Sequence, residues 1–198
     1  MMLTVTELEA RMRPGGYSEK GFLGPGESLE GVIERDEMAL REMGISYEEI
    51  ANAIRRVIDD TLQQHEQRLR RQLSKRPQEF EKGLSPERKD LHIPNLYQPE
   101  TIPEFDLNRM PVIDEGYLVE PDLQVFYSQY RGFQECPWGC NTAEGSRDFL
   151  ILNRMNGEYF RGPSLIVHLI REHHFFEGTG TPFRTDPSKA ARVLGLAR

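Results

Sequence analysis

Cysteine is scarce in this chain, with two residues among 198, and both lie within five consecutive positions as Cys136 and Cys140. This count excludes a scaffold held together by several disulfides. A bridge between the two would close a very small loop and add little stability. In a reducing compartment, such a pair more often binds a metal or carries out redox chemistry than forms a structural disulfide.

Long hydrophobic runs are also absent. No apolar segment approaches the ~18–20 residues that span a bilayer. Residues Met1 to Pro14 lack the apolar core of a signal peptide, and they place Arg11 and Arg13 beside Glu7 and Glu9. We therefore expect a cytoplasmic protein that is neither exported nor inserted into a membrane.

The chain has no excess of positive charge. It carries 25 Lys and Arg against 32 Asp and Glu, for a net charge of -7. This balance argues against binding of bulk nucleic acid. One local exception is residues 66–89, where Lys and Arg outnumber Glu. A solvated helix face and linker is the favoured interpretation of this segment, and a nucleic-acid surface is the alternative.

The first part of the chain divides into an arm and two helices. Residues 1–27 are rich in glycine and predict an irregular arm with one short helical segment, and Tyr17, Phe22 and Leu23 are candidates to attach this arm to a partner surface. Residues 28–75 predict a helical hairpin.

The hairpin prediction rests on capping signals and on an apolar stripe. The first helix runs from Ser28 to Met43 and ends at Gly44, a favoured helix terminator. Ser46 and Glu49 then form the pattern of a capping box, which predicts a second helix reaching about Leu73.

Apolar side chains recur at helical spacing along the second helix, at Ile50, Ile54, Val57, Ile58 and Leu62. Two helices alone rarely bury enough surface to be stable. We therefore expect the 46–73 helix to pack on the C-terminal domain, on a protein partner or on a second copy of the chain.

Residues 76–111 hold six of the 13 prolines. Such density excludes long helices and central strands, because proline lacks a backbone N–H and clashes with the preceding helical turn. The segment predicts an extended linker, or a wrap around the domain that follows.

Residues 112–198 predict a small α+β domain. The pattern indicates one hairpin joining 112–113 to 117–119, a strand over 123–130, and a second hairpin around Asn156-Gly157. A buried helix follows, starting at Gly162-Pro163-Ser164 with Ser164 as its cap and ending between Gly178 and Pro182. A last short helix runs from Asp186 to Leu194. The whole chain is thus predicted as α+β, with a small antiparallel sheet packed on a buried C-terminal helix.

This C-terminal domain contains four candidate metal ligands. Pro137 and Gly139 favour a tight turn that presents Cys136 and Cys140 to one point, and His168 and His173 follow on the predicted helix. Zinc prefers such sulfur and nitrogen ligands in tetrahedral arrangement. The order of ligands is similar to that of the Cys2His2 finger class, but the gap from Cys140 to His168 is far longer, so no DNA-reading role follows.

The fourth ligand stays open at this point. His168 and Glu172 are four positions apart and share a helical face. His173 lies about 140° from His168 at 100° per residue, so it converges only where the end of the helix loosens. His174 and Glu172 are its competitors. The metal-free alternatives are a pair of unreactive buried thiols with a core histidine, and a redox dithiol.

These observations lead to one favoured function and two alternatives. Two Cys and two His would close the coordination sphere, which favours a non-catalytic, zinc-stabilised binding or regulatory protein over an enzyme. A metal-dependent hydrolase would instead use Cys136, Cys140 and His168, with Glu172 or His174 as general base. A nucleic-acid binder would use residues 66–89.

Overall fold

The computed structural model describes residues 3–74, 116–129, 133–142 and 146–197. The helices and strands, in chain order, are α1 (Val5–Met12), α2 (Leu29–Met43), α3 (Tyr47–Ser74), β1 (Tyr117–Val119), β2 (Leu123–Gln129), β3 (Arg147–Asn153), β4 (Tyr159–Pro163), α5 (Ile166–His173) and α6 (Pro187–Val193). The α+β class is confirmed. The proline-rich segment 76–111 and most of the basic residues in 66–89 lie outside the described residues.

Local capping signals fix the limits of several helices. The Ser28 side chain accepts from the N–H of Gly31 at the start of α2, and Gly44 ends that helix in the left-handed region at φ 67°. Ser46 and Glu49 form the predicted capping box of α3, because each side chain accepts the other residue's backbone N–H.

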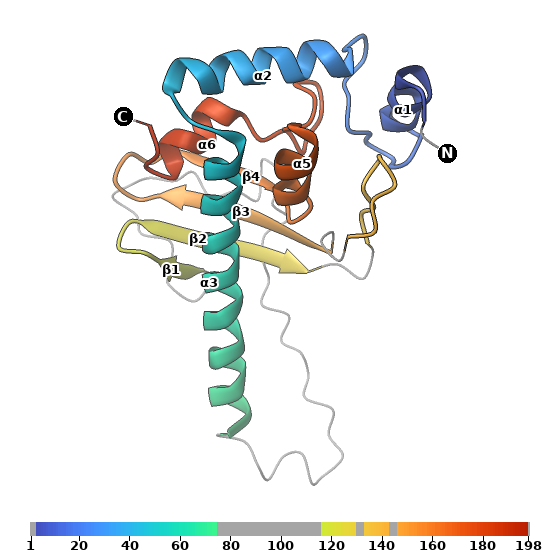
Figure 1. Cartoon of the computed structure of the whole chain (residues 1–198). Coiled ribbons are helices and arrows are strands. Elements are labelled where there is room, and N and C mark those ends of the chain that lie inside the picture. Colours follow the sequence, from blue (N-terminus) through green and yellow to red (C-terminus); the bar gives the residue numbers. More distant parts are fainter. Residues whose placement is uncertain (1–2, 75–115, 130–132, 143–145, 198) are drawn as a thin grey trace, which may run out of the picture.

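Helices α2 and α3 are consecutive, but they pack on different parts of the C-terminal region. α2 contacts α6, whereas α3 mainly contacts α5 and β1 and touches α6 less extensively. Figure 1 shows α2 lying across the top of the α5 and α6 layer, while α3 runs down past the sheet and its second half extends beyond it. The two helices therefore enclose α5 and α6 from two sides.

The apolar stripe of α3 is covered by the chain itself. Ile50, Ile54, Val57 and Ile58 are at most 4% exposed, and they join the main core. Leu69, in the polar second half, is 42% exposed. Self-association through the 46–73 helix stays a prediction that now concerns its second half. Among the described helices, none combines the length and apolarity needed to cross a bilayer.

The sheet is an antiparallel meander in the order β1-β2-β3-β4. Strands β3 and β4 form the hairpin predicted around Asn156-Gly157, with Gly157 at φ 72°. β1 pairs with β2 through a turn at Glu120, so that Tyr117 faces Val125. The strand expected to pair with 117–119 at residues 112–113 lies outside the described residues.

Both faces of this sheet are apolar. Alternate side chains of β2 and β3, such as Val125 and Ile151, join the main core with the helices. The residues between them form a second buried cluster of Phe126, Leu150 and Leu152. This alternation follows from the two-residue period of a strand.

The limits of α5 differ from the sequence prediction. Strand β4 continues to Pro163, and the Ser164 N–H donates to the Arg147 carbonyl at 2.7 Å, so Ser164 extends the sheet. The N-cap is Leu165, without a side-chain cap, and the expected capping role of Ser164 is wrong. The helix also ends earlier than predicted, because His174 adopts φ 54° and the Phe175 N–H returns to the Leu169 carbonyl.

The N-terminal segment belongs to the main core. α1 begins at a capping box between Thr4 and Glu7. Phe22 and Leu23 are fully buried in the chain's own core, so the expectation that they contact a partner surface is wrong. Tyr17 is only partly buried, and its hydroxyl donates to Glu135 at 2.6 Å.

Candidate metal centre

The two thiols lie on a tight turn, as their spacing predicts. The Gly139 N–H donates to the Cys136 carbonyl at 2.8 Å, with Pro137 at the position where its fixed φ favours a turn. Gly139 then takes φ 81°, a conformation that glycine adopts without strain. The backbone N–H groups of Trp138 and Cys140 donate to the Cys136 sulfur. Such N–H···S bonds favour a thiolate over a thiol.

The two imidazoles come from α5. His168 lies in its first turn, and His173 is its last residue. Because the chain turns away at His174, the His173 ring lies at the open end of the helix and reaches the thiol turn. The ring centroids of His168 and His173 are 5.1 Å apart, at 74° to each other. The helix end therefore brings together two residues whose separation of five positions would place them on different faces.

The structure brings all four predicted side chains into one group. The candidate ligand atoms of Cys136, Cys140, His168 and His173 all lie within 4.8 Å of one another and could hold a metal ion. The His173 Nε2 atom is 3.4 Å from the Cys136 Sγ and 3.3 Å from the Cys140 Sγ. Tetrahedral zinc, with Zn–S of about 2.3 Å and Zn–N of about 2.0 Å, requires a sulfur–nitrogen separation of about 3.5 Å. The two separations between the His173 nitrogen and the sulfurs thus match such a site.

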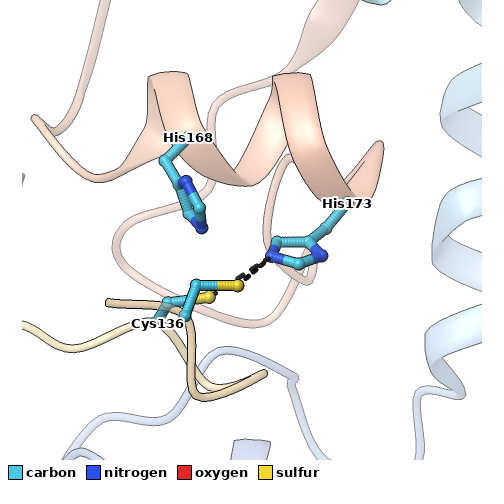
Figure 2. Close-up of side chains that lie close together, drawn as sticks. Cys136, His168 and His173 are labelled. Atoms are coloured by element: carbon cyan, nitrogen blue, oxygen red, sulfur yellow. Dashed lines mark hydrogen bonds between the residues drawn. The ribbon is translucent and has the colours of Figure 1, made fainter. Parts of the chain in front are cut away.

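His168 provides the clearest sign of a missing partner. Its Nε2 atom is buried, and no hydrogen-bond partner satisfies it. Figure 2 shows the His168 ring pointing from α5 toward Cys136, on the same side as the His173 ring. Buried polar atoms are nearly always paired in folded proteins. A cation bound among the four ligand atoms would supply the partner that this nitrogen lacks.

Burial sets the charges of this group. It raises the pKa of the Cys136 thiol to about 11. It lowers the pKa of His173 to about 4, and the neighbouring His168 and His174 add to that effect. The pKa of His168 is also lowered by burial, against an opposing effect of Glu172. At neutral pH both imidazoles are uncharged and offer lone pairs, whereas Cys136 must lose a proton to become a ligand.

The two competitors for the fourth position lie elsewhere. The His174 ring stacks on Tyr47 of α3, with centroids 4.2 Å apart and planes at 8°. Glu172 is exposed and does not belong to the four-residue group. His173 is therefore the residue that completes the group.

No family model, curated protein or solved structure matches the chain.

Sequence reasoning missed three residues that surround the group. The Trp138 ring lies flat against His173, with centroids 4.0 Å apart and planes at 2°. Arg11 donates from Nη1 to the Pro137 carbonyl at 3.0 Å, and Tyr17 holds Glu135. Trp138 could have been suspected from its place between the cysteines. Arg11 and Tyr17 carry no such signal, since more than 100 residues separate them from the turn.

Proposed function

We propose that this chain binds one zinc ion through Cys136, Cys140, His168 and His173 in a closed structural site. We further propose that it acts as a non-catalytic, zinc-stabilised binding or regulatory protein. The unpaired, buried Nε2 atom of His168 is the observation that carries the metal half of this proposal.

The donor set selects the metal. Two sulfurs and two imidazole nitrogens in a tetrahedral arrangement suit zinc, whereas calcium and magnesium require oxygen ligands. A cluster of iron and sulfide is usually held by four thiolates, and this chain has two cysteines. Zinc is therefore the ion that fits the group best.

The number of ligands argues for a structural role. Catalytic zinc keeps an open position for water, whereas four protein ligands close the sphere. The site joins the thiol turn to the end of α5, and the apolar residues of α5, among them Leu169 and Ile170, are in the main core. A bound ion would thus stabilise the fold directly, because the free energy of binding adds to that of folding.

The binding half of the proposal concerns the second half of α3. This part of the helix extends beyond the sheet (Figure 1), and Leu69 and Arg70 are exposed there. A protein partner or a second copy of the chain would pack on this surface. The mass of the protein in solution tests self-association: a dimer that Leu69→Glu converts to a monomer supports it, and a monomeric wild type excludes it.

Elemental analysis tests the metal half. Protein purified without added metal should contain one zinc per chain, and His173→Asn should lose it. His174→Asn is the matched control, since it alters the adjacent imidazole, which stacks on Tyr47, and asparagine tolerates a positive φ. Absence of zinc from the wild type, or equal zinc content in the two variants, would contradict the proposed site.

A further inference from the structure

The thiol turn contacts two parts of the chain that are distant in sequence. On one side it meets α5, through the ligand group and through Trp138, which packs on both His173 and Phe175. On the other side it meets the N-terminal segment. Figure 1 shows the turn, at residues 133–142, lying beside α1 and away from the sheet. The metal group therefore sits between α5 and the N-terminus.

Three contacts join the turn to the N-terminal segment. Arg11, in the last turn of α1, donates to the Pro137 carbonyl at 3.0 Å. The Tyr17 hydroxyl donates to the Glu135 carboxylate at 2.6 Å. The Arg11 guanidinium also lies 4.3 Å from the centroid of the Tyr17 ring, at the distance of a cation–π contact. Arg11 and Tyr17 thus act as a unit, and each holds a residue on the Cys136 side of the turn.

Among the residues that the structure describes, the other hydrogen bonds of α1 connect it to nearby sequence. The Met12 carbonyl accepts from Phe22 and Leu23, and the Glu9 carboxylate accepts from the Leu29 N–H. These bonds join α1 to the loop that follows it. The Arg11 bond to Pro137 joins α1 to sequence more than 100 residues away, and Pro137 is directly beside a candidate ligand.

We infer that Arg11 and Tyr17 are positioning residues for the metal centre, so that metal occupancy and docking of α1 are coupled. The inference rests on the proposed zinc site. A bound ion would fix Cys136 and Cys140 against α5, and the fixed turn would present the Pro137 carbonyl and Glu135 to the N-terminal segment. Because coupling between two binding events is reciprocal, a docked α1 must raise the affinity for zinc by the same factor by which zinc favours docking.

The test uses the full chain and two substitutions that leave all four ligands intact. Arg11→Met keeps the length of the side chain but removes its charge and donors, and Tyr17→Phe keeps the ring but removes the hydroxyl. Supporting contacts around metal ligands are typically worth 10–100-fold in metal affinity. We expect the double variant to bind zinc about tenfold or more weakly in competition with a chromophoric chelator. Replacing Arg11→Met by Arg11→Lys in this double variant should recover part of the lost zinc affinity. Arg41→Met is the matched control, because the hydrogen bond that the structure gives for the Arg41 side chain is to Glu37, within α2 and away from the thiol turn.

Hydrogen exchange distinguishes coupling from a purely structural role of Arg11 and Tyr17, because only coupling makes the protection of α1 amides depend on zinc. In the wild type, zinc should slow exchange of the α1 amides more than that of the α6 amides, and in the double variant this difference should disappear. Equal slowing in α1 and α6, or wild-type zinc affinity in the double variant, would overturn the coupling while leaving the zinc site standing. A wild type that binds no zinc would overturn both.

Discussion

The described part of the chain holds two groups of buried and half-buried polar side chains, whose polar atoms find partners in different ways. The metal group consists of Cys136, Cys140, His168 and His173. The second group, here termed the Arg184 cluster, consists of Asp36, Glu177, Thr181 and Arg184. In the metal group the proposed partner is an ion from outside. In the Arg184 cluster most partners come from the chain itself.

The Arg184 cluster is built around a buried ion pair. Arg184 binds both carboxylate oxygens of Asp36, at 2.6 and 2.5 Å, and also donates to the Glu177 carbonyl at 2.6 Å. The side chains of Asp36 and Arg184 are 2% and 11% exposed. The pair joins α2 to the loop before α6, and so holds α2 over the C-terminal region.

Glu177 lowers the cost of burying a carboxyl group without an ion-pair partner. Its Oε1 atom is buried without a partner, and its Oε2 atom accepts from the Thr181 hydroxyl at 3.3 Å. Burial raises the pKa of Glu177 well above its ordinary value, and the nearby charge of Asp148 adds to the effect. A neutral carboxylic acid costs far less to bury than a carboxylate. The unpaired His168 nitrogen fits the proposed cation, whereas the unpaired Glu177 oxygen fits a carboxyl group that keeps its proton.

Removal of zinc should give a large loss of stability. With free zinc at 1,000 times its dissociation constant, the ion adds about 4 kcal/mol to the free energy of unfolding. A chelator, or the Cys140→Ser substitution, should remove that contribution, as measured by urea unfolding with and without zinc. If the wild type unfolds at the same urea concentration with zinc and with chelator, the metal group is not stabilised by zinc.

Breaking the Arg184 cluster should destabilise the chain independently of metal. Arg184→Met leaves the Asp36 carboxylate buried without its partner, which typically costs about 3–5 kcal/mol. The double variant Asp36→Leu with Arg184→Met should recover much of this loss, because no unpaired charge remains. Both variants should keep wild-type zinc affinity, and a parallel loss of zinc would show that the two groups are one unit.

Glu177 should give an effect that depends on pH. Its pKa is raised in the folded state, so between about pH 4.5 and that raised value the folded chain holds a proton that the unfolded chain releases. Its contribution to stability is therefore complete below pH 4.5 and falls as pH rises, by up to about 1.4 kcal/mol per pH unit. Glu177→Gln should remove this slope and be the more stable protein at neutral pH. Urea unfolding of both proteins from pH 5 to pH 8 checks this, and parallel pH profiles would refute it.

Zinc binding by the metal group should also release protons, which the Arg184 cluster would not do. Burial holds Cys136 protonated at neutral pH, with a pKa of about 11, and keeps His173 unprotonated, with a pKa of about 4. Zinc binding at pH 7 should therefore release at least one proton, from a thiol and not from an imidazole. Calorimetry in buffers of different ionisation enthalpy counts these protons. A count of zero would mean that Cys136 does not bind the ion.

Features that depend on neighbouring residues could be predicted from the sequence. Ser28, Gly44 and the Ser46 capping box gave the helix limits, and Asn156-Gly157 gave a hairpin, because caps and tight turns need particular residues at particular positions. The start of α5 was misplaced, since Ser164 looks like a cap and only its pairing with Arg147 shows that it extends a strand.

Features that depend on distant contacts could not be predicted. The cysteine and histidine types indicate the metal group, but only the fold at the end of α5 distinguishes His173 from Glu172 and His174 as the fourth member. Asp36 and Arg184 are 148 positions apart, and neither lies in a pattern that indicates burial. A charged side chain can be buried at low cost only beside a partner, and a partner this distant in sequence is visible only in the folded structure.

X-ray absorption at the zinc edge tests the metal centre most directly. Zinc-loaded wild type should show two sulfur neighbours at about 2.3 Å and two nitrogen neighbours at about 2.0 Å. His173→Asn is expected to lose its zinc on purification, and after reloading with added zinc it should show the scattering of one imidazole in place of two. His174→Asn should leave the spectrum unchanged. A zinc shell made only of oxygen and nitrogen, or one that is identical in the two variants, would contradict the site.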